Sequence, residues 1–102
     1  MTYARIWRGR TTRDKADAYE SYWLAHGIKP LPDRGAKTVQ MMREDRERES
    51  EFVTISSWDS IEAMGAGPDL TRTHHLPRDP KFLIELPQHV QILTVLETHG
   101  KT

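Results

Sequence analysis

Apolar and polar positions alternate in the first residues of the chain, and three later segments have the composition of β-strands. These segments are rich in the aromatic and β-branched side chains that suit a pleated surface. The predicted strands are residues 3–10 (YARIWRGR), 38–43 (TVQMMR), 52–58 (FVTISSW) and 90–96 (VQILTVL). The last segment is almost entirely apolar, which predicts that both of its faces are covered.

A helical period replaces the alternation between the first two predicted strands. Large or apolar residues recur at positions 16, 19, 23 and 26, which is the spacing of one helix face. We therefore expect a first helix from Thr12 to His26, ended by Gly27. A loop over residues 29–35 should follow, because this segment contains two prolines, an aspartate and a glycine.

Two shorter helices are predicted between the third and fourth strands. Asp59, followed three residues later by Glu62, matches an N-terminal capping pattern, and glycines at positions 65 and 67 should end that helix early. Asp79 and Pro80 mark a second helix start, and Pro87 should end it.

A highly charged run, EDRERESE, occupies residues 44–51 between the second and third predicted strands. Its charges are of both signs, and its position between two strands favours a hairpin tip over an interaction tail. We therefore predict a solvent-exposed loop with no function of its own.

The predicted order of elements is that of an α+β fold with a ferredoxin-like split βαβ antiparallel sheet and helices on one face. The strands carry apolar residues on both faces; examples are Ile6 and Trp7, Met41 and Met42. Because the helices of such a short chain can cover only one face, we expect a second copy of the chain to cover the other. The sequence thus predicts an isologous homodimer.

Composition restricts the possible partners. Fifteen Lys and Arg residues balance 15 Asp and Glu residues, so the formal net charge is zero and no basic field indicates nucleic acid or an anionic membrane. No apolar run approaches the length of a membrane span, and the first residues lack the apolar core of a signal peptide. We expect one domain over residues 1–102, located in the cytoplasm. The chain has no cysteine, which excludes disulfides, thiolate catalysis and cysteine-based zinc sites.

Four segments together resemble the antibiotic biosynthesis monooxygenase (ABM) domain family. They are ARIWRG (4–9), KADAY (15–19), FVTISSWDSIEAM (52–64) and LPRDPKFLIELPQHVQILTVL (76–96). The most specific piece is Trp58 followed by the acidic Asp59 at the expected helix start. The resemblance implies a dimeric α+β barrel in which each subunit has a pocket between its helices and its sheet.

The resemblance also implies an activity. Some ABM proteins oxidise aromatic polyketide intermediates without metal or flavin, and others degrade haem. In the haem-degrading members an Asn occupies the position of Trp7, and a Trp occupies the region of Gly67, so haem degradation is not implied here. We expect a cofactor-independent monooxygenase that acts on an aromatic or polycyclic substrate. The alternative is a non-catalytic dimeric domain that binds a small apolar ligand or has a structural role, since a fold does not determine a function.

Aromatic side chains are the expected walls of the pocket. Trp7, Tyr22, Trp23 and Trp58 could enclose a flat apolar ligand. A helical stripe of such residues more often belongs to the core, and this alternative stays open. Arg5 and Arg43 lie on predicted strands and are candidate cations to stabilise an anionic intermediate.

Histidines are the candidate general bases, because imidazole titrates near neutral pH. His74 and His75 follow the second predicted helix, where the resemblance implies a pocket histidine, and His26 lies at the end of the first. The alternative is that all three are surface groups, with His26 favoured at its helix end by the helix dipole. No metal site is predicted, because no HxH or HExxH spacing occurs, and no motif indicates a nucleotide.

Overall fold

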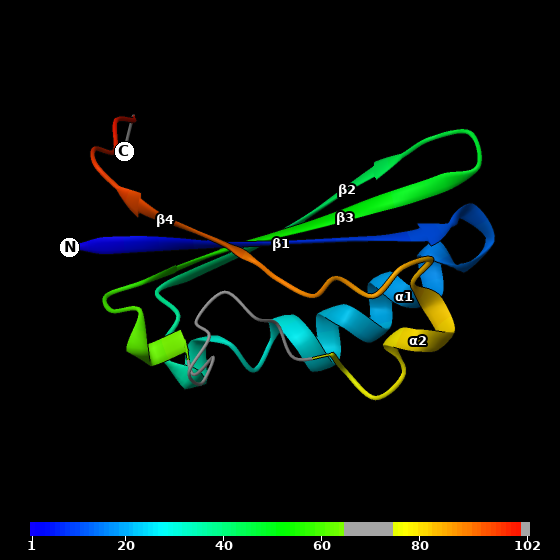
Figure 1. Ribbon diagram of the computed structural model, residues 1–102, viewed down its shortest axis with the longest axis horizontal. Coiled ribbons are helices and arrows are strands. Elements are labelled where there is room, and N and C mark those ends of the chain that lie inside the picture. Colours follow the sequence, from blue (N-terminus) through cyan, green and yellow to red (C-terminus); the bar gives the residue numbers. More distant parts are fainter. Residues whose placement is uncertain (65–74, 101–102) are drawn as a thin grey trace.

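The computed structural model describes residues 1–64 and 75–100. The described residues form one four-stranded antiparallel sheet with two α-helices on one of its faces (Figure 1). The strands are β1 (Thr2–Thr12), β2 (Thr38–Asp45), β3 (Glu49–Trp58) and β4 (Gln91–Val95), and the helices are α1 (Ala16–Trp23) and α2 (Asp79–Phe82). The predicted α+β class is confirmed.

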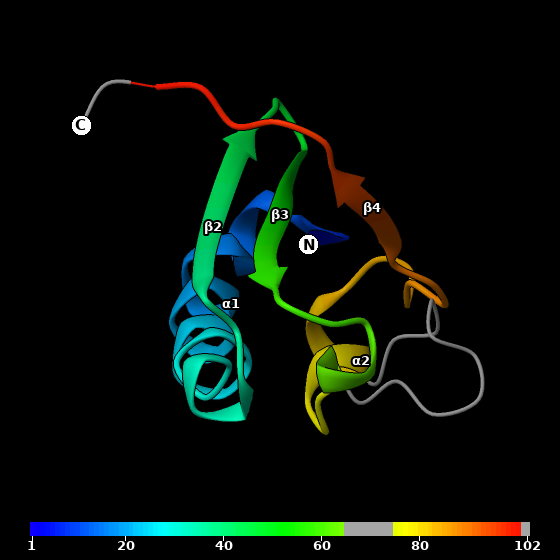
Figure 2. The ribbon, with the colours of Figure 1, turned by 90° about the vertical axis from the view of Figure 1, so that its left-hand side faces the viewer.

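The strand order in the sheet is β2-β3-β1-β4, and every neighbouring pair is antiparallel. β1 and β3 form the long central ladder, which runs from Tyr3 opposite Trp58 to Thr12 opposite Glu49. Helix α1 follows β1, α2 precedes β4, and both helices lie on the same side of the sheet (Figure 2). This is the ferredoxin-like split βαβ arrangement that the order of elements predicts.

Side chains on β3 alternate strictly between the two faces of the sheet. Ser50, Phe52, Thr54, Ser56 and Trp58 are buried, and the residues between them are half-buried. The register places Trp7 of β1 opposite Thr54, so the odd-numbered residues of β1 share this buried face. Because the helices lie against it, this face forms the core.

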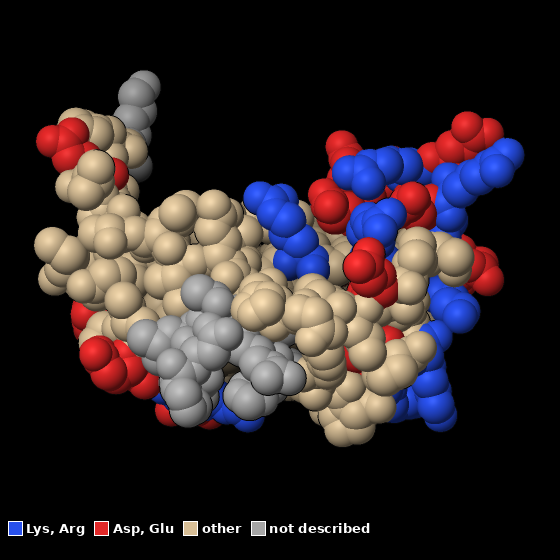
Figure 3. All heavy atoms as spheres, viewed as in Figure 1, with Lys and Arg blue, Asp and Glu red and all other residues tan. Residues whose placement is uncertain are grey.

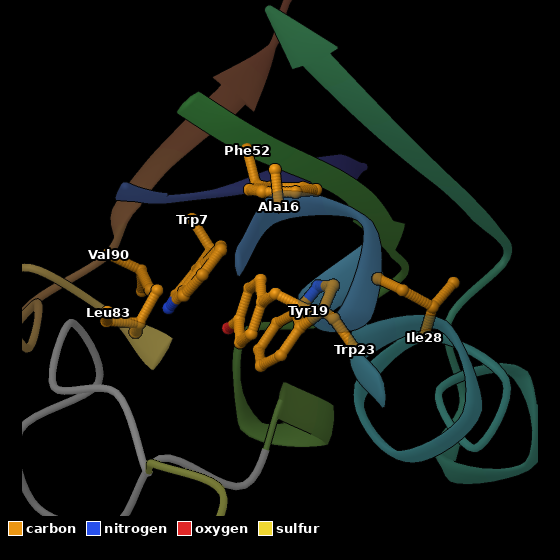
Figure 4. Packing of buried hydrophobic residues seen from close by; sticks show 8 residues of the cluster. All are labelled: Trp7, Ala16, Tyr19, Trp23, Ile28, Phe52, Leu83 and Val90. Atoms are coloured by element: carbon orange, nitrogen blue, oxygen red, sulfur yellow. The ribbon is translucent and has the colours of Figure 1, made fainter. Parts of the chain in front are cut away.

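The core is a cluster of apolar side chains, half of them aromatic, between α1 and the central strands (Figure 4). The indoles of Trp7 and Trp23 are stacked, with ring centroids 4.3 Å apart, and the ring of Tyr19 meets that of Phe52 edge to face at 5.2 Å. Such aromatic pairs contribute about 0.5–1.5 kcal/mol each beyond the burial of their area. The contacts therefore hold α1 firmly on the sheet.

Gly9 lets the indole of Trp7 lie flat against β1. A Cβ atom at position 9 would be only 2.4 Å from Cη2 of Trp7, closer than atoms can approach. A glycine at this point of the strand is therefore a requirement of close packing.

The end of α1 differs from the prediction. Gly27 does not end the helical segment, because a π-helical turn continues the chain from Leu24 to Ile28. A Cβ at position 27 would be 2.8 Å from Cδ2 of Trp23, so this glycine gives the indole room. A π-turn adds one residue to a helical turn, and such turns often occur at functional sites.

The charged loop predicted over residues 44–51 is shorter in the structure. Only residues 46–48 form the tip, while Glu44 and Asp45 belong to β2 and residues 49–51 belong to β3. The charges are compatible with strands because Arg46 of the tip pairs with acidic residues of both strands: it contacts Glu44 of β2 at 2.7 Å and Glu51 of β3 at 3.3 Å. Charged side chains gather at this end of the molecule (Figure 3).

The two short helices are shorter than predicted. The first is a single 3-10 turn, Glu62–Met64, and the hydroxyl of Ser60 accepts the hydrogen bond from the Ala63 N–H, whereas Asp59 forms an ion pair with Lys37. The glycines expected to end it lie outside the described residues. Helix α2 ends at Phe82, well before Pro87. Leu83 has an extended backbone and forms an isolated β-bridge with Thr11.

The face of the sheet opposite the helices is apolar near its centre. Ile6, Ile55 and Val53 are half-buried there, and Met42 and Leu93 are 41% and 43% exposed. The prediction that the last strand is covered on both faces therefore does not hold within a single chain. In the part of the chain described, no helix is both long enough and apolar enough to cross a membrane.

Candidate functional site

A cavity of about 140 Å³ lies between the C-terminal end of α1 and the sheet. Its buried floor consists of Trp23, Thr54 and Trp58, and the exposed residues His26 and Arg34 lie at its mouth. The π-turn that follows Trp23 brings His26 and Gly27 to the cavity. Leu31, Met64 and Leu76 form its apolar wall, and Arg5 also lines it.

Both indole N–H groups of the floor have hydrogen-bond partners within the protein. Nε1 of Trp23 donates to Oγ1 of Thr54 at 3.0 Å, and Nε1 of Trp58 donates to Oγ of Ser56 at 2.9 Å. These bonds fix the planes of the two rings. The floor therefore presents fixed apolar surface to a ligand.

Three basic residues line the cavity: Arg5 from β1, His26 from the π-turn, and Arg34 from the 3-10 turn Pro32–Arg34. Burial lowers the pKa of the Arg5 guanidinium below its ordinary value, because loss of hydration disfavours the charged form. Among the described lining residues there is no Asp or Glu. Every charged side chain among the described lining residues is therefore basic.

The structure brings four of the predicted site residues together at this cavity: Arg5, His26, Trp23 and Trp58. Trp7 is 1% exposed and is stacked on Trp23, so it packs in the core next to the floor. The open alternative, that the aromatic stripe is core, is thus right for Trp7, while Trp23 both packs in the core and lines the cavity.

Tyr22 and Arg43 do not line the cavity. The ring of Tyr22 stacks on Phe82 at 5.6 Å, and its hydroxyl accepts a hydrogen bond from the backbone N–H of Arg78. Arg43 forms ion pairs with Asp17, Glu20 and Asp45, which raise the pKa of its guanidinium. Both residues therefore fix α1 against neighbouring segments.

Of the two described candidate bases, His26 lines the cavity and His75 does not. The ring of His26 lies 5.0 Å from that of Tyr22. His75 is exposed, and its Nε2 lies 2.6 Å from the carbonyl oxygen of Pro87. His74 lies outside the described residues. Of the two described candidates, only His26 can reach a molecule in the cavity directly.

A buried carboxyl group lies close to α1 but outside the cavity. Oδ1 of Asp79 accepts a hydrogen bond from the Tyr19 hydroxyl at 3.2 Å, and Oδ2 accepts one from the Leu76 N–H at 2.9 Å. Burial raises the pKa of Asp79, and these hydrogen bonds offset part of the rise. The pair connects the segment that carries Leu76 to α1, so it positions one wall of the cavity.

Sequence reasoning missed Arg34, Thr54 and Leu76 as lining residues. Arg34 lies in a proline-rich loop without periodicity, so no pattern indicates where its side chain points. Thr54 occurs in a strand whose alternation does predict the buried face, but its partner Trp23 is 31 residues away. Only the tertiary structure shows that these residues meet.

The cavity is suited to a small flat molecule. A cavity of about 150 Å³ holds a benzene ring, whereas drug-sized ligands occupy about 300–1,000 Å³. Among residues 1–64 and 75–100, no three His, Asp or Glu side chains are grouped as metal ligands.

Comparison with solved structures finds the same fold in three candidate antibiotic biosynthesis monooxygenases. The protein from Nitrosomonas europaea superimposes with a TM-score of 0.69 at 17% identity, over 97% of this chain and 94% of that one. The Bacillus cereus protein gives 0.66 at 12% identity, and the Chloroflexus aurantiacus protein gives 0.62 at 20% identity, each over 98% of both chains.

No family model and no curated protein matches the sequence. At these identities the likeness to solved structures concerns the fold, and at that level it confirms the resemblance to ABM proteins seen in the sequence.

Proposed function

We propose that this chain is a small monooxygenase that works as a homodimer, without a cofactor, on an aromatic substrate bound in the cavity between α1 and the sheet. The observation that carries the proposal is a cavity that combines an aromatic floor with a histidine at its mouth. The fold shared with candidate monooxygenases supports it.

His26 acts as the general base. It removes the proton from a phenolic hydroxyl at the mouth of the cavity, while Arg5 stabilises the resulting anion. Trp23 and Trp58 enclose the ring from the buried side, which keeps water away from the electron-rich anion.

The reaction balances without an external reductant. The anion gives an electron to O₂, and the two radicals combine to form a C–O bond at a ring carbon that carries hydrogen. The hydroperoxide then loses water, so that one oxygen atom leaves as water and the other becomes the second carbonyl of a quinone. The substrate supplies all four electrons, so that one phenol and one O₂ give one quinone and one water.

The test is oxygen consumption by the purified protein with single-ring phenols and quinols and with an anthrone. We expect oxygen uptake with at least one of them, accompanied by the absorbance of the quinone product. The His26→Ala variant should lose about 100-fold or more in kcat, because a positioned base contributes roughly 10²–10⁴-fold.

The matched control is His99→Ala, because His99 is exposed and pairs with Glu97 outside the cavity. No oxygen uptake with any of these substrates would contradict the proposal. Loss of activity in His74→Ala or His75→Ala but not in His26→Ala would assign the base to a histidine other than His26.

A non-catalytic binding domain is the second candidate. The small size of the cavity favours it, together with the near-complete burial of Trp7 at 1% exposure and of Trp58 at 2%. Such a domain would bind a small aromatic ligand in the same cavity and consume no oxygen. Binding in the absence of turnover distinguishes the two candidates.

A further inference from the structure

Aromatic side chains that can lose an electron are in contact from the cavity to the surface. In a chain without cysteine, tryptophan and tyrosine are the side chains that lose a single electron most readily. The ring of Tyr19 lies 5.9 Å from that of Trp23 (Figure 4), and the ring of Tyr22 lies 6.3 Å from that of Tyr19. Trp23 lines the cavity, and Tyr22 is half-buried. Trp23, Tyr19 and Tyr22 therefore form an aromatic series that leads from the cavity towards solvent.

The packing of the core does not explain the hydroxyl group of Tyr19. This residue is fully buried, and its hydroxyl donates to Oδ1 of Asp79, which is only 1% exposed. Burial of a carboxyl group costs free energy, and a phenylalanine at position 19 would fill nearly the same space without a polar partner. The local turn is already fixed by the other oxygen, Oδ2, which accepts from the Leu76 N–H. The phenol and the carboxyl group therefore form a pair that packing alone does not require.

The hydrogen-bond partners give the series a direction. Nε1 of Trp23 donates to the hydroxyl of Thr54, which is a weak base, so an oxidised Trp23 keeps its proton and remains a strong oxidant. The hydroxyl of Tyr19 faces a carboxyl group whose two oxygens both accept hydrogen bonds. Burial raises the pKa of Asp79, which makes its carboxylate a stronger base. Because an oxidised phenol is a strong acid, the positive charge should move from Trp23 to Tyr19 as the proton moves to Asp79.

We propose that Trp23, Tyr19 and Tyr22 carry an oxidising equivalent out of the cavity, with Asp79 as the proton acceptor of Tyr19. The function is protective: the series removes a radical that would otherwise damage the buried indoles. It goes beyond the proposed oxygenation and does not depend on it. Electron transfer needs contact between rings rather than exposure, so the near-complete burial of Trp23 does not prevent it.

The oxidant is an organic peroxyl radical, which forms when O₂ adds to a carbon radical, and the reductant is a soluble thiol. The peroxyl radical takes an electron from Trp23 and a proton from water and becomes a hydroperoxide. Trp23 takes an electron from Tyr19, whose proton moves to Asp79. Tyr19 then takes an electron from Tyr22 and recovers its proton, while Tyr22 loses its own proton to water. A hydrogen atom from the thiol restores Tyr22, so that one peroxyl radical and one thiol give one hydroperoxide and one thiyl radical.

The test generates the charge on tryptophan with an ultraviolet laser pulse, which ejects an electron from a buried indole. In the parent, the absorption of the tyrosyl radical should rise as that of the tryptophan radical decays, at a rate independent of protein concentration. Tyr19→Phe keeps the ring but removes the electron donor, so it should slow this transfer about tenfold or more. The matched control is Tyr3→Phe on β1, outside the series, which should leave the rate unchanged. An unchanged rate in folded Tyr19→Phe would overturn the proposal.

The role of Asp79 is tested separately. Asp79→Asn removes the base and should slow the transfer about fivefold or more, although Tyr19 is still present. Heavy water should slow the transfer in the parent, because the proton moves with the electron. The matched control is Asp45→Asn, which removes an exposed carboxyl group bonded to Arg43 and Ser50 and should have no effect. An unchanged rate in Asp79→Asn, with the fold verified by urea denaturation, would overturn the assignment of the proton acceptor.

Protection is measured as chemical damage. The parent and its variants are given repeated pulses in air with glutathione, and oxidised residues are located by mass spectrometry. Tyr19→Phe should accumulate about fivefold or more oxidation on Trp23 than the parent does. Tyr22→Phe should still pass the charge to Tyr19, but the tyrosyl radical should last longer, because glutathione cannot reach a fully buried ring. Equal damage to Trp23 in the parent and in Tyr19→Phe would overturn the protective function. None of these measurements uses an oxygenase substrate, so their failure is distinct from failure of the proposed function.

Discussion

Two buried threonines on the same face of the sheet differ in the state of their hydroxyl groups. Oγ1 of Thr54 accepts the hydrogen bond from Nε1 of Trp23. Among the described residues, Oγ1 of Thr11 is buried without a hydrogen-bond partner. Both residues are at most 1% exposed, so the presence of a partner is the main difference between them.

This difference predicts opposite effects of the same substitution. Thr11→Val should leave the free energy of unfolding unchanged or raise it by about 1 kcal/mol, because an unsatisfied buried hydroxyl is removed. Thr54→Val should lower it by about 1–3 kcal/mol, because the indole N–H of Trp23 loses its acceptor in a buried site. Urea denaturation of the three proteins measures both changes. Equal destabilisation by the two substitutions would contradict this account.

At the residue scale, the sequence predicts side-chain types better than contacts. The aromatic residues and His26 could be nominated because their chemistry is visible in the sequence, and Trp23, Trp58 and His26 do line one cavity. Trp7 could not be distinguished from them, because its burial depends on the close approach that Gly9 permits. The location of Arg34 depends on the path of a loop that no periodicity describes.

At the scale of elements, Asp79 connects the segment before α2 to α1. Burial raises the pKa of its carboxyl group, so the native state holds the proton more tightly than the unfolded chain does. The contribution of Asp79 to stability is therefore complete below its unfolded pKa, at about 4, and is lost as the pH rises through its native pKa.

The Asp79→Asn variant makes this dependence measurable, because the amide stays neutral at every pH. Its oxygen can accept the hydrogen bond from the Leu76 N–H, and its NH₂ group can donate to the hydroxyl oxygen of Tyr19. The free energy of unfolding of the parent protein, relative to the variant, should fall as the pH rises from about 3 to 7. Urea denaturation at a series of pH values measures it, at one protein concentration.

Asp45 provides a control of opposite sign. Hydrogen bonds from Ser50 and Arg43 lower its pKa, so its contribution is present above its unfolded pKa and is lost as the pH falls through the native pKa. Relative to Asp45→Asn, the parent should therefore gain stability as the pH rises. The same slope for both variants would show that the carboxyl groups are not responsible.

The elements themselves were largely predictable, and the errors have physical causes. The order of strands and helices could be predicted because the spacing of apolar residues changes between strand and helix segments, and this change is visible even in a short sequence. The length of the strands β2 and β3 was underestimated because charges usually indicate loops, whereas here Arg46 of the tip forms ion pairs with Glu44 of β2 and Glu51 of β3. The π-turn at Gly27 could not be predicted, since it depends on the indole of Trp23 lying against that residue.

At the scale of the whole molecule, the apolar side of the sheet that faces away from the helices requires a cover. Leu93, opposite Ala4 on this side, is 43% exposed, and Met42 is 41% exposed. Exposed apolar area of this kind is typical of interfaces. We propose that a second copy of the chain covers it, because one patch would then serve as both halves of the interface.

Leu93→Glu tests this arrangement. A twofold interface contains each substitution twice, so two buried charges should weaken the dimer at least tenfold and shift the protein to monomers at low micromolar concentration. Analytical ultracentrifugation should give twice the chain mass of 11.8 kDa for the parent protein. The matched control is Leu24→Glu on the helical side, where Leu24 is 41% exposed, and this variant should remain dimeric. A parent protein that sediments as a single chain would contradict the dimer.

The stack of Trp7 on Trp23 has an optical consequence. The two chromophores lie 4.3 Å apart with their planes inclined by 17°, so their electronic excitations couple. One belongs to the central strand and the other to α1, so the coupled band in the circular dichroism spectrum lasts only while the two layers touch. Helix content calculated from ellipticity would be distorted by this band, and the band itself would monitor the docking of α1 during refolding.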